Sequence, residues 1–229
     1  MIVLLILGID TSCACAKVAL LKDGRVLGTS YADDMKTHSV KLMPMVDEVL
    51  KSNNVLPADL NLIGVVTGPG SFTGLRIGVT TAKAIAYAAD TKLVGVNTLD
   101  FLAASVSEKD VLICPVVDAR NTNVYCNAYE NGSPLWECEV LSSECLAKKL
   151  KDLNKEVVFT GDGAEKYFEI YRDILGDLCK TAPANEIKGR AEVLCYITEK
   201  KQAEAENAFE LQVNYYRITQ AERMKNGGN

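Results

Sequence analysis

The sequence has a single histidine, His38, among its 229 residues. One histidine cannot supply the paired imidazoles of many metal centres, and it gives no confident Ser-His-Asp set. None of the eight cysteines forms a CxxC pair, which disfavours a zinc site of that type. We therefore expect no metal site and no nucleophilic catalysis, and we expect His38 to start a helix or make a contact. A carboxylate-only site for a hard ion, around Asp10 and Asp118, stays open.

The sequence also lacks an excess of positive charge and long apolar runs. Its formal net charge is −5, which disfavours a protein that holds nucleic acid by itself. No apolar run reaches the ~18 residues that a membrane span needs. The apolar residues 1–9 lack a basic leader and end at Asp10, so we interpret them as a core strand rather than a signal peptide. With free thiols expected in a reducing compartment, these features predict a cytoplasmic protein without a membrane role.

Residues 62–89 combine an apolar run, a glycine-rich loop and a long segment of small side chains, which predicts strand, loop and helix. Gly68, Gly70 and Gly74 would permit positive φ or a close backbone approach. Ser71 or Thr73 is expected to cap the helix. Such a loop could hold an anion on backbone N–H groups, or it could simply be a turn. It matches neither the P-loop nor the dinucleotide pattern, so both interpretations stay open.

Each half of the chain shows three strand-like runs, a helix, a further strand and a helix. The pattern predicts a duplicated α/β architecture, two lobes with a cleft between them, and an aspartate after the first strand of each lobe. We place the N-terminal lobe at 1–106, a reduced C-terminal lobe at 107–223 and a flexible tail at 224–229. The predicted strands are 1–9, 14–21, 25–31, 62–66, 93–96, 111–117, 124–129, 135–141 and 156–160; the predicted helices are 37–52, 75–89, 98–106, 142–153, 164–175 and 191–203.

Three motifs resemble the TsaB (YeaZ-like) family, and the resemblance covers nearly the whole chain. They are Ile-Asp-Thr-Ser at 9–12, Thr-Gly-Pro-Gly-Ser-Phe-Thr-Gly-Leu-Arg at 67–76, and Tyr216-Arg217 followed by Gln220-Ala221-Glu222. The second motif is highly specific. The resemblance implies an actin-like, Hsp70-like ATPase fold with two βββαβαβα-type lobes.

The resemblance also implies a function and partners. It points to a non-catalytic partner of a TsaD-like paralogue, the enzyme that forms threonylcarbamoyladenosine on tRNA beside the anticodon. A TsaE-like ATPase would join the two, tRNA would be met only through the complex, and the free chain would form a homodimer. The alternative is a stand-alone enzyme of the same fold, a small-molecule kinase or carbamoyl transferase.

The loop motif marks a candidate nucleotide or anion site, with no cofactor required and nucleotide binding expected at most at a complex interface. Its residues are Asp10, Ser12, Gly68, Gly70, Ser71, Thr73, Gly74 and Arg76. In ATPases of this fold, the residue that Asp10 resembles helps to place metal and phosphates; we favour a role capping its turn. Arg76 could reach an anion, pair with a carboxylate or form an ion pair within the loop. Cys13 and Cys15 are expected to have no basic neighbour that lowers a thiol pKa.

The predicted helices 37–52 and 75–89 carry more apolar or small residues than one buried stripe needs. We therefore expect them to form a docking face for a second subunit. The alternative is that both helices are simply buried in the N-terminal lobe. The candidate interface residues are His38, Leu42, Met43, Val46, Val49, Ile77, Thr80, Thr81, Ala84 and Ala88.

Overall fold

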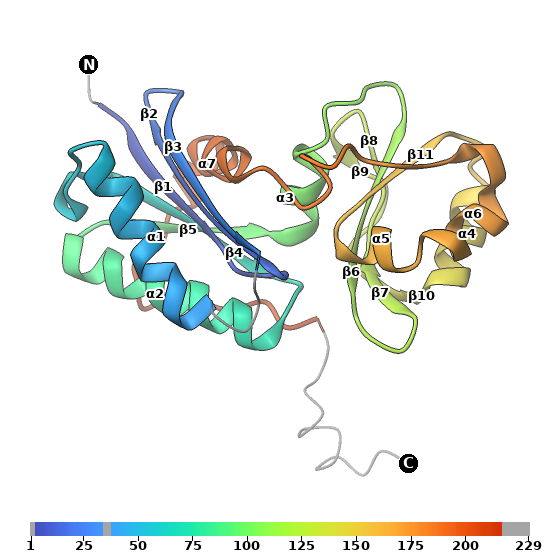
Figure 1. Cartoon of the computed structure of the whole chain (residues 1–229), viewed down its shortest axis with the longest axis horizontal. Helices are drawn as coiled ribbons and strands as arrows, with labels where there is room; N and C mark the ends of the chain where they lie inside the picture. Colours follow the sequence, from blue (N-terminus) through green and yellow to red (C-terminus); the bar gives the residue numbers. More distant parts are fainter. Residues whose placement is uncertain (1–2, 34–37, 217–229) are drawn as a thin grey trace, which may run out of the picture.

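The computed structural model describes residues 3–33 and 38–216, which form two mixed sheets set side by side (Figure 1). The N-terminal sheet has the order β3-β2-β1-β4-β5. Its strands are β1 (Leu5–Asp10), β2 (Cys15–Lys22), β3 (Arg25–Asp33), β4 (Leu62–Gly68) and β5 (Lys92–Asn97). β1 is antiparallel to β2 and parallel to β4. Asp23 and Gly24 form the hairpin turn between β2 and β3, and both have positive φ, 49° and 74°.

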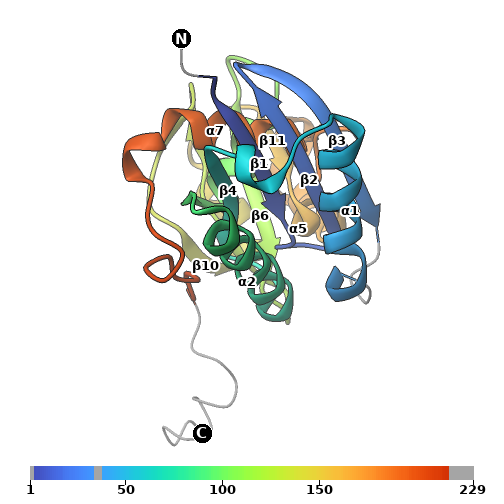
Figure 2. The same cartoon turned by 90° about the vertical axis from the view of Figure 1, so that its left-hand side faces the viewer.

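Helices cover both faces of this sheet. On one face lie α1 (His38–Ser52), the 3-10 turn η2 (Pro57–Asp59) and α2 (Phe72–Ala89); α3 (Thr98–Ala104) follows β5. The other face is covered by α7 (Ala191–Lys200), as Figure 2 shows. Glycines let α7 approach closely: a Cβ at Gly64 would lie 1.8 Å from Thr198 Oγ1. Because β1 is buried on both faces, its sequence is a continuous apolar run rather than an alternating one.

The C-terminal sheet repeats the same arrangement with the order β10-β7-β6-β11-β12. Its strands are β6 (Leu112–Asp118), β7 (Asn123–Cys126), β10 (Glu139–Ser142), β11 (Val157–Thr160) and β12 (Cys179–Thr181). Its helices are α4 (Ser143–Lys151), α5 (Asp162–Lys166) and α6 (Phe168–Leu175), followed by η3 (Gly176–Leu178). The duplicated α/β architecture is therefore confirmed, and the chain has the actin-like fold of two related lobes.

Several predicted boundaries in the second half are wrong. The Asn-Gly turn at 131–132 joins only a short hairpin, β8 (Tyr129–Glu130) with β9 (Ser133–Pro134), and the third long strand is β10. The predicted helix 164–175 is divided at Tyr167 into α5 and α6. In the first half, α1 begins at His38 and runs through Pro44 to Ser52, close to the predicted helix 37–52. Residue 37, where the predicted helix begins, lies outside the described residues.

The end of the described chain returns to the N-terminal lobe. After α7 come η4 (Gln202–Glu204) and residues 205–216, named here the C-terminal segment. Leu93 of β5 exchanges two backbone hydrogen bonds with Glu206, at 2.9 and 2.8 Å, and Asn214 N donates to Thr67 O. The division of the chain at 106/107 stays a prediction, but residues 191–216 pack on the N-terminal sheet rather than in the C-terminal lobe. The predicted tail 224–229 lies outside the described residues.

The chain passes between the lobes twice, after α3 and before α7, and hydrogen bonds join these two connecting segments. Glu186 is 5% exposed, and its carboxylate accepts hydrogen bonds from the backbone N–H and the hydroxyl of Ser107. Arg190 N donates to Ser105 Oγ at 3.0 Å. Within residues 3–33 and 38–216, no helix combines the length and apolar character that crossing a membrane demands.

Candidate functional site

The turn after β1 is held by a buried ion pair. Asp10 Oδ2 lies 2.7 Å from Lys17 Nζ, and both side chains are 1% exposed. Asp10 Oδ1 accepts a hydrogen bond from Ser12 N at 2.8 Å, and Lys17 Nζ donates to Cys15 O at 3.1 Å. Burial is the largest single influence on Lys17 and lowers its pKa, but the charge and hydrogen bond of Asp10, together with nearby Cys13 and Cys15, bring that pKa above its ordinary value. Asp10 therefore stabilises its own turn, as we favoured.

Sequence reasoning missed Lys17. The signal for it was present, since Lys17 is a lone cation inside the apolar strand β2 and needs a buried counter-charge. It faces Asp10 directly across the β1–β2 pair. Its ammonium group binds Asp10 Oδ2, an oxygen that would otherwise be available to a cation.

The glycine loop packs against the turn that holds Asp10. Gly68, at φ 126°, precedes Pro69 through a cis peptide bond. A Cβ at Gly70 would lie 2.5 Å from Ser12 O, and one at Gly74 would lie 2.1 Å from Thr11 O. Close backbone approach, rather than positive φ, therefore explains Gly70 and Gly74. The carbonyl of Gly74 also accepts a hydrogen bond from Thr11 Oγ1 at 2.7 Å.

Some of the backbone donors that an anion could use near the start of α2 are already engaged. Ser71 is the N-cap, because its hydroxyl accepts from Gly74 N at 3.2 Å. Ser71 N donates to Ser12 O at 2.7 Å. Thr73 is exposed and is not the cap. The structure thus brings Asp10, Ser12, Gly70, Ser71 and Gly74 together, but as partners of one another; anion binding there stays a prediction.

Arg76 takes part in an aromatic cluster instead of an ion pair within the loop. Its guanidinium carbon lies 3.9 Å from the centre of the Phe72 ring and 5.9 Å from that of Tyr215. Its Nε donates to the Tyr215 hydroxyl at 3.0 Å. No salt bridge of Arg76 occurs among the described residues, so neither of the two ion pairs that the sequence left open for it is formed there.

The aspartate of the second lobe, Asp118, also forms an ion pair with a lysine. Asp118 Oδ2 lies 2.5 Å from Lys166 Nζ, and Asp118 Oδ1 accepts from the Tyr167 hydroxyl at 2.7 Å. Burial acts to raise the pKa of Asp118, but these hydrogen bonds bring it below its ordinary value. Within residues 3–33 and 38–216, no three His, Cys, Asp or Glu side chains gather as a metal site would require. Asp10 and Asp118 each have a lysine partner, Lys17 and Lys166.

The two cysteines beside the first turn are poor nucleophiles. Burial raises the pKa of the Cys13 thiol well above its ordinary value, and nearby Asp162 and Asp10 raise it further. Burial likewise raises the pKa of Cys15. The expectation that no basic residue is near them is wrong, because Lys17 lowers both pKa values, though by less than burial raises them.

The candidate docking residues divide into two groups. His38, Leu42, Val46 and Val49 are 1–4% exposed and pack inside the chain, so they are core residues rather than interface. His38 begins α1, as expected, and its Nε2 donates to Ala14 O at 3.0 Å. The side chains of Ile77 and Thr81 are half-buried. The exposed members are Met43, Thr80, Ala84 and Ala88.

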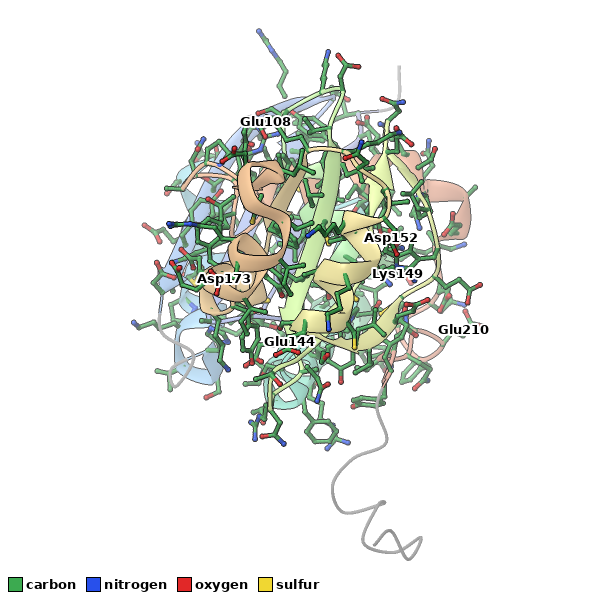
Figure 3. All side chains as sticks on the ribbon, turned by 90° about the vertical axis from the view of Figure 1, so that its right-hand side faces the viewer. Glu108, Glu144, Lys149, Asp152, Asp173 and Glu210 are labelled. Atoms are coloured by element: carbon green, nitrogen blue, oxygen red, sulfur yellow. The ribbon has the colours of Figure 1, made fainter. Side chains whose placement is uncertain are left out.

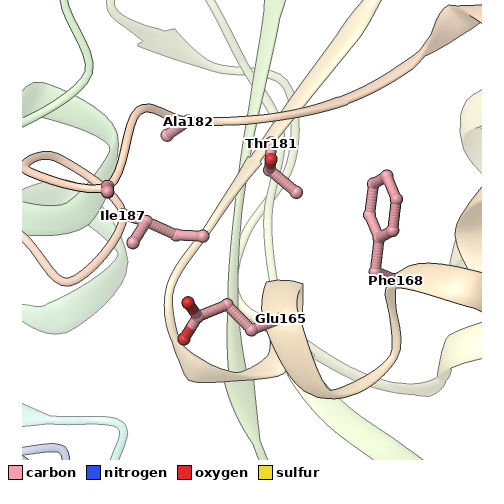
Figure 4. Close-up of a pocket in the computed structure, with 6 residues that line it drawn as sticks. Glu165, Phe168, Thr181, Ala182 and Ile187 are labelled. Carbon is pink, nitrogen blue, oxygen red and sulfur yellow. The ribbon is translucent and has the colours of Figure 1, made fainter.

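A separate pocket lies in the C-terminal lobe, between α5, α6 and the chain after β12 (Figure 4). Its lining includes Glu165, Phe168, Thr181 and Ile187, and none of its lining residues is a lysine or arginine. Without a cation it is poorly suited to phosphate. It shares no lining residue with the loop or the helix face described above.

Comparisons with known proteins agree on one family. A family model described as "TsaD: tRNA N6-adenosine threonylcarbamoyltransferase" matches residues 32–213. The "tRNA threonylcarbamoyladenosine biosynthesis protein TsaB" of Bacillus subtilis is 34% identical over 95% of this chain and 96% of its own length. The protein of the same name in Escherichia coli is 32% identical over 73% of this chain and 75% of its own.

Solved structures show the same fold. YeaZ from Pseudomonas aeruginosa has a TM-score of 0.78 at 26% identity, over 93% of this chain and 99% of its own. Component A of (R)-2-hydroxyglutaryl-CoA dehydratase from Acidaminococcus fermentans has a TM-score of 0.54 at 14% identity, over 89% of this chain and 100% of its own, which is similarity of fold alone.

Proposed function

Because the chain belongs to the TsaB (YeaZ-like) family, we propose that it is a cytoplasmic, non-catalytic partner of a TsaD-like transferase in forming threonylcarbamoyladenosine on tRNA. The observation that carries this proposal is the outer face of α2. Thr80, Ala84 and Ala88 are exposed, and α2 contains only two charged residues, Arg76 and Lys83. A helix face with so little charge is suited to a second protein rather than to water.

The closed turn at Asp10 supports a partner role over catalysis by this chain. Asp10 is already paired with Lys17, and the buried thiols beside it have raised pKa values. A kinase or carbamoyl transferase of this fold would need groups free to meet phosphate or substrate. The stand-alone enzyme therefore has no support from this part of the molecule.

The remaining partners are part of the same proposal. The TsaD-like paralogue docks on the α2 face, and without it two copies of this chain pair through that face. A TsaE-like ATPase joins the complex, nucleotide binds at most between subunits, and tRNA is met only through the complex. Small side chains let a partner helix approach at the short end of the ~8–10 Å range of interaxial distances.

The proposal is tested by Ala84→Arg, which should leave the chain folded and abolish both pairings, because a long charged side chain would be buried in the helix contact. Ala104→Arg is the matched control, since Ala104 is an exposed alanine of α3 outside this face. Met43→Glu is a second test on α1. The double variant with Val46→Glu is unsuitable, because Val46 is 2% exposed and its replacement would unfold the lobe.

The measurements are gel filtration of the chain alone and with a TsaD-like protein, with circular dichroism as the check on folding. If Ala84→Arg stays folded and still pairs, the docking face lies elsewhere. If the parent chain does not bind a TsaD-like protein at all, the proposed partnership is wrong.

A further inference from the structure

Two large aromatic side chains stand on the surface beside the α2 face. Phe209 of the C-terminal segment is 77% exposed and Tyr87 of α2 is 70% exposed. Their ring centres are 5.5 Å apart and the rings meet edge to face, at 73°. They contact each other, yet each leaves most of its surface in water, which is costly for groups of this size.

Phe209 is held in place rather than hanging from a loose end. Its neighbours Ala208 and Leu211 are buried, at 8% and 4% exposed, in the core beneath α2. Glu210 N donates to Asn207 O, and Asn207 N donates to the Glu210 carboxylate, both at 3.0 Å. These bonds close a turn that presents the Phe209 ring outward. A side chain fixed before binding loses less freedom when a partner covers it.

Tyr87 belongs to the stripe of α2 that carries the proposed docking residues. It follows Ala84 by three positions and precedes Ala88 by one, so the three lie on one side of the helix. The aromatic pair is therefore continuous with the α2 face, and the C-terminal segment adds to that face from a distant part of the sequence. Figure 2 shows this segment coming down from α7 along the edge of the N-terminal lobe.

The small side chains of α2 cannot by themselves supply a stable contact. A stable interface buries about 800 Å² on each partner. An aromatic side chain can bury ~150–250 Å², far more than alanine or threonine offers. The opposite end of the molecule is unlike this face: Figure 3 shows charged side chains there, including Glu144, Lys149 and Asp173 on α4 and α6.

We propose that Tyr87 and Phe209 form an aromatic anchor that inserts into an apolar pocket on the TsaD-like partner. This inference rests on the proposed function and extends its interface to the C-terminal segment. Aromatic residues that become buried against a partner carry much of the binding free energy in protein interfaces.

The test is the affinity of the full-length chain for the TsaD-like protein, measured by titration calorimetry. Phe209→Ala and Tyr87→Ala should each raise Kd by about 10- to 30-fold. Phe209→Leu, which keeps apolar bulk, should recover part of the loss. The matched control is Leu135→Ala, since Leu135 is 41% exposed in the C-terminal lobe, and it should leave Kd unchanged. Circular dichroism should show unchanged folding, because both rings are mainly exposed.

The outcomes show whether the aromatic anchor fails alone or together with the proposed function. If Ala84→Arg abolishes binding while both aromatic variants bind like the parent, the anchor is refuted and the partnership stands. If the partner binds and Ala84→Arg has no effect, the α2 face and its anchor are both refuted. If the parent chain does not bind the TsaD-like protein, both proposals fail.

Discussion

Replacing Lys17 by methionine should destabilise the chain strongly, because it leaves the Asp10 carboxylate buried without its counter-ion. Methionine nearly conserves the volume of the lysine stem, so the change is mainly one of charge. Asp10 is 1% exposed and would keep only the hydrogen bond from Ser12 N. Removing one partner of a buried ion pair costs about 3–5 kcal/mol of unfolding free energy. For a chain of this length that corresponds to a fall in Tm of roughly 6–20 °C.

The assay is thermal and urea unfolding of the parent, Lys17→Met, and the double variant Asp10→Asn with Lys17→Met. The double variant should recover most of the loss, since it has no unpaired charge and the oxygen of the introduced amide can still accept from Ser12 N. Asp10 holds the pKa of Lys17 above its ordinary 10.5. The stability contributed by Lys17 is therefore complete below pH 10.5 and is lost as pH rises through the folded-state pKa. Equal Tm values for all three proteins would refute the reasoning.

Two further predictions concern the loop and the second lobe. Gly74→Ala should lower the free energy of unfolding by about 1–3 kcal/mol, because its Cβ would meet Thr11 O at 2.1 Å. In the control Gly132→Ala, the Cβ meets nothing within 4 Å, so this variant should lose only the strain of positive φ. Equal losses of unfolding free energy in urea would contradict this. Asp118→Asn should cost about 1 kcal/mol or less at neutral pH, since Lys166 is half exposed. Because the pKa of Asp118 is lowered from 3.8, that difference should vanish as pH falls below the lowered pKa; a difference that persists at the acid end of a urea-unfolding pH series would refute it.

The fold was largely predictable because most of its helices and strands have recognisable local sequence patterns. The continuous apolar run of β1, the Asp-Gly turn and the repeated strand pattern each follow from short-range rules. The second lobe was harder to predict, because the turn signal at Asn131-Gly132 is real but serves only the short β8–β9 hairpin. Nothing local distinguishes that hairpin from one joining two long strands.

The candidate site was predicted less well, because its contacts join distant parts of the sequence. The partner of Arg76 is Tyr215, 139 positions away, and α7 leaves the second lobe to pack on the first sheet. The apolar residues of α1 were correctly recognised as numerous, but helical spacing alone could not tell Val46, which is core, from Met43, which is exposed. Lys17 was the one member of the site that a charge inside a buried strand could have revealed.

Threonylcarbamoyl transfer to tRNA in a reconstituted system tests the central claim most directly. The reaction would be followed with this chain alone, with a TsaD-like protein alone, with both, and with the Ala84→Arg variant in place of the parent. We predict no transfer by this chain alone, transfer when both are present with the other components of the system, and a loss of that transfer with Ala84→Arg. Transfer by the isolated chain, or full activity with a folded Ala84→Arg variant that no longer binds the TsaD-like protein, would contradict the account.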